Sequence, residues 1–269
     1  MYDLKWWKQS SPVQNFGDYL GEYMASFFSE VEYGQKNSKL LLRNVGSVIA
    51  NVVIDNDLSE GYEKIVYFGC GARGSKIKPD FLQKCYFCSV RGPLSRALLG
   101  LPDDTPIGDS AFMLPMLYEP KESPEGRSGV LLVTHFNETR TDDELLKLTG
   151  CDSVLPTVIE KNHESVERLI DQIANSSFVF TSSLHGAIVA AVYNIPFAYW
   201  SSSEVNVPFK WKDFSLSIGL DCEFHERLED GVLWYEKEKI KLIKPDSADL
   251  VFRYKKLSEG VSGLRQVTY

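Results

Sequence analysis

The sequence predicts an α/β protein with two lobes and a cleft between them. In the second half of the chain, apolar strand-like runs alternate with helix-like segments, a pattern typical of parallel sheets covered by helices. Short apolar runs between helical segments occur in the first half as well. The stretch YEPKESPEGRSG (118–129), rich in Pro, Gly, Ser and charge, separates the halves. We therefore expect lobes at 1–122 and 123–269, with the C-terminal segment packing back toward the first lobe.

Length and composition are those of an ordinary globular protein. The 269 residues, 43% of them hydrophobic, suffice for a sizeable core. A net charge of -8 disfavours general nucleic-acid binding, because phosphate backbones need a basic surface. There is no run of about 18 apolar residues, and the N-terminus MYDLKWWKQSS lacks the apolar core of a secretion signal. We expect a cytoplasmic protein without a membrane-spanning helix.

The first half begins with short apolar runs and one clear helical pattern. The apolar runs are 4–7, 64–69 and 85–90. Between the first two lies GDYLGEYMASFF (17–28), which has a helical pattern. The last run contains a Cys-x-x-Cys pair, Cys85 and Cys88, without a second pair or a histidine at zinc spacing. We interpret these cysteines as buried thiols in a reducing compartment and expect no metal site.

The glycine-rich stretch YFGCGARGSK follows one of these apolar runs. Its Gly69, Gly71 and Gly74 match the G-x-G-x-x-G dinucleotide fingerprint, which requires a helix to open at the last glycine. SKIKPDF follows instead, and Pro79 is expected to interrupt any helix there. We therefore expect no nicotinamide cofactor, and interpret the stretch as an anion-facing loop that contains Arg73.

The stretch SVRGPLSRALLG (89–100) is a strand-to-helix junction. Arg91 closes the strand, and Pro93 suits the first turn of a helix. A guanidinium at this position offers two parallel hydrogen bonds to a phosphate or a carboxylate. The alternative is a salt bridge between the lobes.

Three further polar stretches accompany expected elements. Asn15 and Asp18 open a helix, and either cap it or face the cleft. Asp109 precedes AFMLP (111–115), an expected extended run, and either holds a loop or orients a ligand. The stretch FKWKDF combines bases and aromatics at a helix start, a mixture suited to sugar or phosphate contact. Its candidates are Lys210, Trp211 and Asp213.

The second half alternates more regularly. Gly150 ends one helical pattern, and the helix that follows has an apolar stripe on one face. The expected strands are 129–135, 152–156, 178–181 and 195–200, and the expected helices are 141–150, 163–176 and 184–194.

The junction TSSLHG (181–186) lies at the carboxyl end of an expected strand, where α/β sheets bind ligands. Ser182 or Ser183 can cap the helix that follows, whose free N–H groups favour an anion. Gly186 lets a ligand approach the backbone closely. His185 has its protonated form disfavoured by the helix dipole unless a phosphate pairs with it. The junction is either a phosphate seat with a proton carrier or a capped helix with an incidental histidine.

Together these motifs resemble the polysaccharide pyruvyl transferase family, and within it the succinoglycan-type ketal pyruvyltransferases of bacterial exopolysaccharide synthesis. The ordered set spans roughly residues 14–220, although no single motif is specific. It comprises NFGD (15–18), GCGAR (69–73), VRGPLSR (90–96), IGDSAFMLP (107–115), SSLHGAIVAA (182–191) and FKWKDF (209–214). The resemblance implies two Rossmann-like lobes with a central cleft, similar to the GT-B glycosyltransferase architecture.

The resemblance also implies a reaction. The donor would be phosphoenolpyruvate and the acceptor a sugar diol, usually on a lipid-linked oligosaccharide. The product would be a cyclic pyruvate ketal of an exopolysaccharide or capsular polysaccharide, with phosphate released. It implies no cofactor and no metal. A lipid-linked acceptor is compatible with peripheral association at the inner face of the membrane.

The resemblance places the donor site on an arginine of the first lobe and an Arg-Leu-His run of the second. Arg91 matches the former, and Leu184 and His185 match the end of the latter. Ser183 stands where many members have arginine, so one phosphate ligand is either missing or supplied elsewhere, by Arg73 or Lys210. The expected donor-binding residues are Arg73, Arg91, Ser183, Leu184, His185, Gly186 and Lys210.

His185 and Arg91 are the expected catalytic residues. An imidazole moves a proton near neutral pH, and a guanidinium stabilises phosphate and carboxylate charge. His135 is the next candidate proton carrier. The residues expected to contact or support the acceptor are Asn15, Asp18, Asp109, His135, Trp211 and Asp213.

The sequence leaves two other functions open. A nucleotide-sugar glycosyltransferase of the same architecture needs an acidic residue late in the second lobe to hold the ribose, and Glu204 is the convenient candidate. A non-catalytic glycan-binding protein is disfavoured by the presence of Arg91 and His185 and favoured by the serine at position 183.

Overall fold

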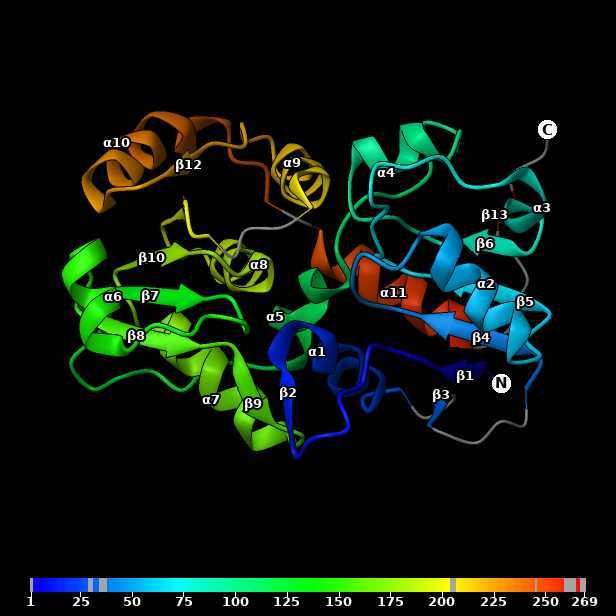
Figure 1. Ribbon diagram of the computed structural model, residues 1–269, viewed down its shortest axis with the longest axis horizontal. Helices are drawn as coiled ribbons and strands as arrows, with labels where there is room; N and C mark the ends of the chain where they lie inside the picture. The colour runs from blue at the N-terminus through cyan, green and yellow to red at the C-terminus, as the bar shows by residue number, and fades with distance from the viewer. Residues whose placement is uncertain are drawn as a thin grey trace.

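The computed structural model describes residues 2–28, 31–33, 38–203, 207–244, 246–258 and 265–266. It is a mixed α/β structure with two sheets side by side, and each sheet consists mainly of parallel strands (Figure 1). The α/β class expected from the alternation of apolar runs is confirmed at this level.

The first sheet has the strand order β13-β6-β5-β4-β1-β3, parallel throughout except where β13 pairs with β6. Its strands are β1 (Tyr2–Leu4), β3 (Val31–Tyr33), β4 (Leu40–Arg43), β5 (Lys64–Tyr67), β6 (Cys85–Phe87) and β13 (Arg265–Gln266). Apolar side chains of the central strands are fully buried on both faces, as parallel sheets require. The helices with it are α2 (Asn51–Ser59), α3 (Pro79–Leu82), α4 (Pro93–Leu98) and α11 (Ser247–Ser258).

The C-terminal helix α11 lies against the first half of the chain (Figure 1). The ring of Tyr254 packs edge-on against Phe68, with centroids 4.9 Å apart. Its hydroxyl accepts a hydrogen bond from Asn44 Nδ2 at 3.0 Å. The last described helix therefore covers the sheet formed by the first strands.

The second sheet has the order β12-β11-β10-β7-β8 and is parallel throughout. Its strands are β7 (Val130–Thr134), β8 (Ser153–Pro156), β10 (Phe178–Thr181), β11 (Phe197–Trp200) and β12 (Phe224–His225). The helices with it are α6 (Asp142–Thr149), α7 (His163–Ala174), α8 (Leu184–Val192), α9 (Pro208–Ser217), α10 (Leu228–Glu238) and the 3-10 turn η2 (Lys239–Lys241). Thr141 and Glu144 form a capping box on α6, and Gly150 ends that helix in the left-handed region, at φ 75°.

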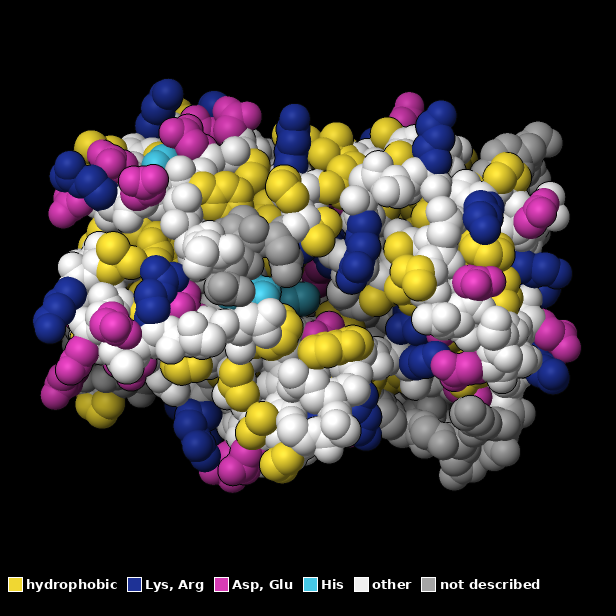
Figure 2. Space-filling model, viewed as in Figure 1, with side chains coloured by type: hydrophobic (Ala, Val, Ile, Leu, Met, Phe, Trp, Pro, Cys, Tyr) yellow, Lys and Arg dark blue, Asp and Glu magenta, His cyan; other side chains and the backbone are white. Residues whose placement is uncertain are grey.

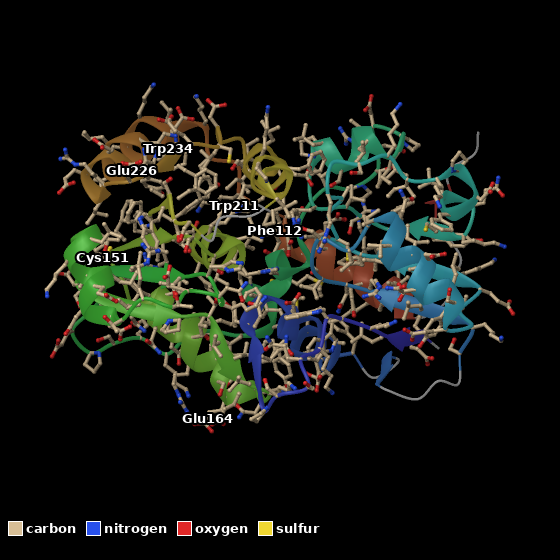
Figure 3. The ribbon with its side chains drawn as sticks, in the orientation of Figure 1. Phe112, Cys151, Glu164, Trp211, Glu226 and Trp234 are labelled. Carbon is tan, nitrogen blue, oxygen red and sulfur yellow. The ribbon has the colours of Figure 1, made fainter. Side chains whose placement is uncertain are left out.

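Several elements join the two sheets. They are α1 (Phe16–Ala25), the 3-10 turn η1 (Ser110–Met113), α5 (Leu114–Leu117) and the antiparallel pair of β2 (Val13–Asn15) with β9 (Val158–Glu160). Phe112 lies near the middle of the molecule (Figure 3). Together with buried side chains of α1 and α8 it belongs to one continuous apolar core that includes residues of both sheets.

One local expectation from the sequence was wrong. The run AFMLP is helical rather than extended, because Asp109 caps η1 by accepting a hydrogen bond from Ala111 N at 3.0 Å. The expectation that no helix opens at Gly74 is confirmed: the next helix, α3, begins only at Pro79, since the first helical position has no use for the missing N–H. No helix in the described part of the chain is long and apolar enough to cross a membrane.

Candidate active site

A cavity of about 870 Å³ lies where loops from both sheets meet. It is lined by residues that follow β1, β4, β5, β6, β7 and β10, and thus by the carboxyl ends of parallel strands. Figure 2 shows a hollow near the middle of this face that contains histidine side chains. Among the described lining residues the basic ones are Lys5, Lys8, Arg43, Arg73, Arg91 and Lys210, and the acidic ones are Asp18 and Glu60. This excess of cations favours an anionic ligand in a protein whose net charge is -8.

Arg91 is completely buried yet lines the cavity. Its Nε donates to Asp109 Oδ2 at 2.9 Å, and its Nη1 donates to Ser47 Oγ at 2.8 Å. Nη2 has no hydrogen-bond partner among the described residues. The guanidinium lies on the backbone of Gly71, where a Cβ would stand 2.4 Å from Nη1. The glycine loop therefore makes room for this arginine. The ion pair with Asp109 lies within the first half of the chain rather than between the halves.

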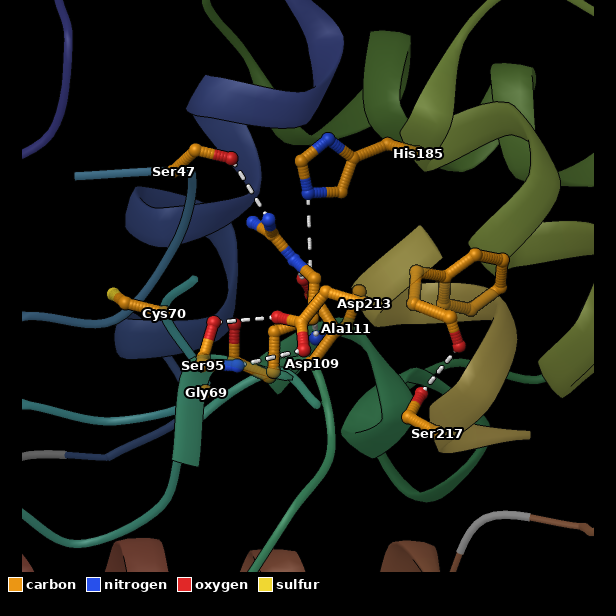
Figure 4. A network of polar contacts seen from close by, with 12 residues as sticks. Ser47, Gly69, Cys70, Ser95, Asp109, Ala111, His185, Asp213 and Ser217 are labelled. Carbon is orange, nitrogen blue, oxygen red and sulfur yellow. Dashed lines mark hydrogen bonds and ion pairs between the residues drawn. The ribbon is translucent and has the colours of Figure 1, made fainter. Parts of the chain in front are cut away.

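Asp109 connects the arginine to the histidine. One carboxylate oxygen accepts from Arg91, and the other lies 3.9 Å from His185 Nε2 (Figure 4). Asp109 does not line the cavity. It supports the site from behind by pairing with the Arg91 guanidinium, lying beside the His185 ring and capping η1.

His185 occupies the first turn of α8 and faces the cavity. Its ring lies directly on Gly17, where a Cβ would stand 2.0 Å from Nδ1. Nε2 forms no hydrogen bond with a described residue. Burial lowers the pKa of His185 to about 4; Asp109 opposes this shift, whereas Arg91 and Lys210 add to it. The imidazole is therefore neutral at pH 7, and its Nε2, which faces Asp109, has no hydrogen-bond partner among the described residues.

The three hydroxyls before His185 hold the junction in place. Thr181 Oγ1 donates to Val133 O at 2.8 Å and accepts from Ser183 N at 2.9 Å. Ser182 Oγ accepts from His135 N at 3.0 Å. Ser183 is the helix cap, with its Oγ 3.4 Å from the N–H of Gly186. These bonds fix the turn that presents His185.

Besides Asp109, three expected site residues do not line the cavity: Trp211, Asp213 and Gly186. Trp211, on α9, is fully buried and packs edge-on against Tyr199. Gly186 is required for packing, because a Cβ there would meet Thr181 Oγ1 at 2.8 Å. The structure gives these three residues packing or capping contacts rather than positions in the cavity wall.

Asp213 instead caps α4 from the other half of the chain. Its carboxylate accepts from Ser95 N at 2.9 Å and from Ser95 Oγ at 2.5 Å (Figure 4). Burial raises the pKa of Asp213, and the hydrogen bonds from Ser95 oppose that shift.

The other expected cations line the cavity. Arg73 Nε donates to Ser47 O at 2.8 Å. Burial lowers the pKa of Lys210 to about 8; the charge of Arg91 adds to the shift and Asp18 opposes it. Both residues line the same cavity as Arg91. They are therefore positioned where a cation replacing an arginine at position 183 would have to lie.

Asn15 and Asp18 face the same space from the start of α1. Asn15 caps α1 with its Oδ1 and donates from Nδ2 to Asp18 Oδ2 at 2.6 Å. Burial raises the pKa of Asp18 to about 6, whereas the hydrogen bond from Asn15 and nearby Lys210 lower it. Asp18 can therefore carry a proton close to neutral pH.

His135 lines the cavity at the end of β7. Its Nδ1 accepts from Asn137 N at 3.3 Å, which places the ring proton on Nε2. Burial lowers the pKa of His135 to about 4, and the charge of Lys210 adds to this shift.

Several residues of the site were not anticipated from the sequence. The segment Lys5–Lys8, Ser47 and Phe136 all line the cavity. The signal available for Ser47 was an apolar run, LLLR, followed by the turn NVGS, which is the same strand-then-small-residue pattern as at TSSLHG. Among the described residues, no group of three or more His, Cys, Asp or Glu is placed to hold a metal ion.

An α/β fold with a basic cavity at its strand ends, containing a buried arginine and a neutral histidine, is suited to binding a small anion. Comparison with known proteins gives the family. Residues 58–203 match the model of the polysaccharide pyruvyl transferase family, more than half of the chain, and the chain belongs to this family. The matched region includes Arg91, Asp109, His135 and His185, but not Lys210.

Two individual proteins are similar. Over 215 residues the chain is 28% identical to the succinoglycan biosynthesis protein ExoV of Rhizobium meliloti (strain 1021). That alignment covers 77% of this chain and 62% of the relative, so the chain spans less than two thirds of the relative's length. The crystal structure of an uncharacterized protein from Klebsiella pneumoniae subsp. pneumoniae NTUH-K2044 matches with a TM-score of 0.46 and 16% identity, covering 80% of this chain and 88% of that chain.

Proposed function

We propose that this protein transfers the pyruvyl group of phosphoenolpyruvate to a sugar diol of an exopolysaccharide or capsular intermediate, forming a cyclic ketal and releasing phosphate. The observation that carries the proposal is the buried Arg91 guanidinium, whose Nη2 has no described hydrogen-bond partner and which lines a cavity rich in cations. A small dianionic ligand would supply the missing acceptor. Membership of the family makes pyruvyl transfer the reaction to test first.

The donor seat is formed by groups from both halves of the chain. Arg91 would hold one anionic group of phosphoenolpyruvate bidentately through Nη1 and Nη2. Arg73 and Lys210 would take the role of the arginine that many family members carry at position 183. The ring of His185, which lines the cavity, would lie against the phosphate or the reacting carbon. No cofactor or metal is assigned to this chemistry.

The reaction removes two protons from the attacking hydroxyls and delivers two, one to the methylene carbon and one to the departing phosphate. Protonation of the methylene carbon makes the neighbouring carbon an oxocarbenium-like electrophile, and a sugar hydroxyl attacks it with loss of its proton. Phosphate then leaves with the electrons of its C–O bond, and a second hydroxyl attacks the same carbon to close the ketal. Neutral His185 would accept a proton from the attacking hydroxyl, and Asp18, with its pKa near 6, would deliver one.

The proposed architecture is two Rossmann-like lobes, 1–122 and 123–269, arranged as in GT-B glycosyltransferases. A lipid-linked acceptor would be met at the cytoplasmic face of the membrane. The rival reading as a nucleotide-sugar glycosyltransferase depended on Glu204, which lies outside the described residues.

Product analysis tests the proposal. The protein is incubated with phosphoenolpyruvate and saccharides that carry free 4,6- or 3,4-diols, and proton NMR follows the methyl group. We expect saccharide-dependent phosphate release and a new methyl singlet of the ketal. Turnover of a nucleotide sugar without phosphoenolpyruvate would instead support the glycosyltransferase, and binding of glycans with no turnover would support a non-catalytic protein.

A further inference from the structure

An exposed tryptophan lies in the wall of the cavity. All five tryptophans are described, and four are nearly or fully buried, whereas Trp7 is 48% exposed. Its ring lies 5.8 Å from that of Phe136, tilted by 53°. Phe136 in turn lies 4.6 Å from the ring of His135. Three rings from two distant segments thus form one aromatic wall.

The backbone beneath Trp7 is fixed. Gln14 is fully buried; its Nε2 donates to Trp7 O at 3.1 Å, and its Oε1 accepts from Gln9 N at 2.8 Å. Lys161 Nζ, from the other half of the chain, donates to Gln9 O and Ser11 O, both at 2.6 Å. The indole is therefore exposed on a backbone that is held from both sides, which reduces the entropy lost when a ligand packs against it.

Hydrogen-bonding groups border the aromatic wall within the same cavity. Lys5 Nζ contacts Glu60 Oε1 at 2.5 Å, and Asn56 and Ser59 also line this space. The cavity volume of about 870 Å³ lies near the upper end of the roughly 300–1,000 Å³ typical of ligand sites, far more than a three-carbon donor fills. Aromatic surface bordered by polar groups suits a sugar ring, whose C–H face stacks on the ring while its hydroxyls take the hydrogen bonds.

We infer that Trp7 and Phe136 form a stacking subsite for a pyranose ring of the acceptor. This inference rests on the proposed function, because it assigns the space that the donor leaves empty. The subsite is separate in its residues from the donor seat around Arg91 and His185.

Fluorescence and calorimetry test the subsite. The probes are β-linked gluco- and galacto-disaccharides, titrated with phosphoenolpyruvate present and absent. In the unmodified protein we expect a change in tryptophan fluorescence on disaccharide binding. Trp7→Phe should keep binding but lose that change, whereas Trp7→Ala and Phe136→Ala should weaken binding by about tenfold or more. The affinity for phosphoenolpyruvate should stay within about twofold in all three variants.

The control is Phe252→Ala, which removes an exposed ring on α11 that does not line the cavity, and which should leave disaccharide affinity unchanged. Disaccharide affinity unaltered by Trp7→Ala and Phe136→Ala, or no disaccharide binding up to the solubility limit, would overturn the inference while leaving phosphoenolpyruvate transfer standing. Trp7-dependent disaccharide binding without any phosphoenolpyruvate binding would support the subsite and contradict the proposed function.

Discussion

Arg91 shows at the scale of one residue why the site calls for an anion. A buried guanidinium loses its hydration, at a cost of several kcal/mol, and Asp109 offsets only part of that through Nε. Leaving a buried donor such as Nη2 unpaired costs about 1–3 kcal/mol more. Unpaired buried donors are uncommon, and in the wall of a cavity a bound ligand can complete one. A phosphate or carboxylate beside Nη2 would do so.

His185→Gln separates proton transfer from phosphate binding. Glutamine can keep a hydrogen bond to the donor but cannot accept a proton, so turnover should fall by about 10² to 10⁴ while donor affinity changes little. Steady-state kinetics and calorimetry measure the two quantities. His225→Gln is the matched control, because His225 is also buried with an unpaired Nε2 but lies on β12, outside the cavity lining. Full turnover in His185→Gln would transfer the role to another group, His135 first.

At the scale of elements, the contact of α4 with α9 connects the two halves beside the site. Asp213 on α9 accepts two hydrogen bonds from Ser95 at the start of α4, where a carboxylate also complements the helix dipole. Gly92 allows the close approach, since a Cβ there would stand 2.0 Å from Asp213 O. This contact holds the segment that carries Arg91 against the helix that carries Lys210.

Gly92→Ala tests that contact. The backbone at Gly92 is extended (φ -155°), so alanine is conformationally acceptable and the whole effect is the clash with Asp213. We expect the free energy of unfolding to fall by about 2–4 kcal/mol, measured by urea denaturation. Gly61→Ala is the control for backbone strain alone, because Gly61 has a positive φ and open space around it, and it should cost about 1 kcal/mol. A loss in Gly92→Ala no larger than in Gly61→Ala would contradict the account.

The elements also differ in how far they could be predicted from the sequence. Helices with local signals were predicted closely, such as α6 with its capping box and Gly150, because those signals lie within a few residues. Elements without such signals were missed, for example β2 and β9, which are three residues each and exist through their pairing across the chain. Likewise Arg91 and His185 stand at visible junctions, whereas the contact of His185 with Gly17 depends on tertiary packing between segments far apart in the chain.

At the scale of the whole molecule, stability should depend on pH through buried site groups. Burial lowers the pKa of His135 and His185 to about 4, so below pH 6.5 the unfolded chain binds more protons at these positions and the folded state loses stability as pH falls toward 4. Burial raises the pKa of Asp18 to about 6, so this carboxyl acts oppositely between pH 6 and its ordinary pKa of 3.8. Because the two histidines lower the stability of the folded state on acidification and only Asp18 raises it, the free energy of unfolding should decline as the pH falls.

Urea unfolding at several pH values between about 4.5 and 7.5 measures this decline. His185→Gln should reduce the decline of the free energy of unfolding with falling pH, by at most about 3 kcal/mol over this range. Asp18→Asn should make it steeper, because it removes the opposing carboxyl. If both variants changed the pH dependence of the free energy of unfolding in the same direction, the environments assigned to His185 and Asp18 would be wrong.

The central claim is that the cavity seats phosphoenolpyruvate on Arg91, and calorimetric titration tests it most directly. We expect phosphoenolpyruvate to bind and NAD(P) and nucleotide sugars not to bind. A folded Arg91→Ala protein should lose about 2–3 kcal/mol of donor affinity, and Arg91→Lys should recover only part of it, since a point charge cannot replace a planar fork. An unchanged dissociation constant for phosphoenolpyruvate in folded Arg91→Ala, or binding of NAD(P) or a nucleotide sugar in its place, would contradict the account.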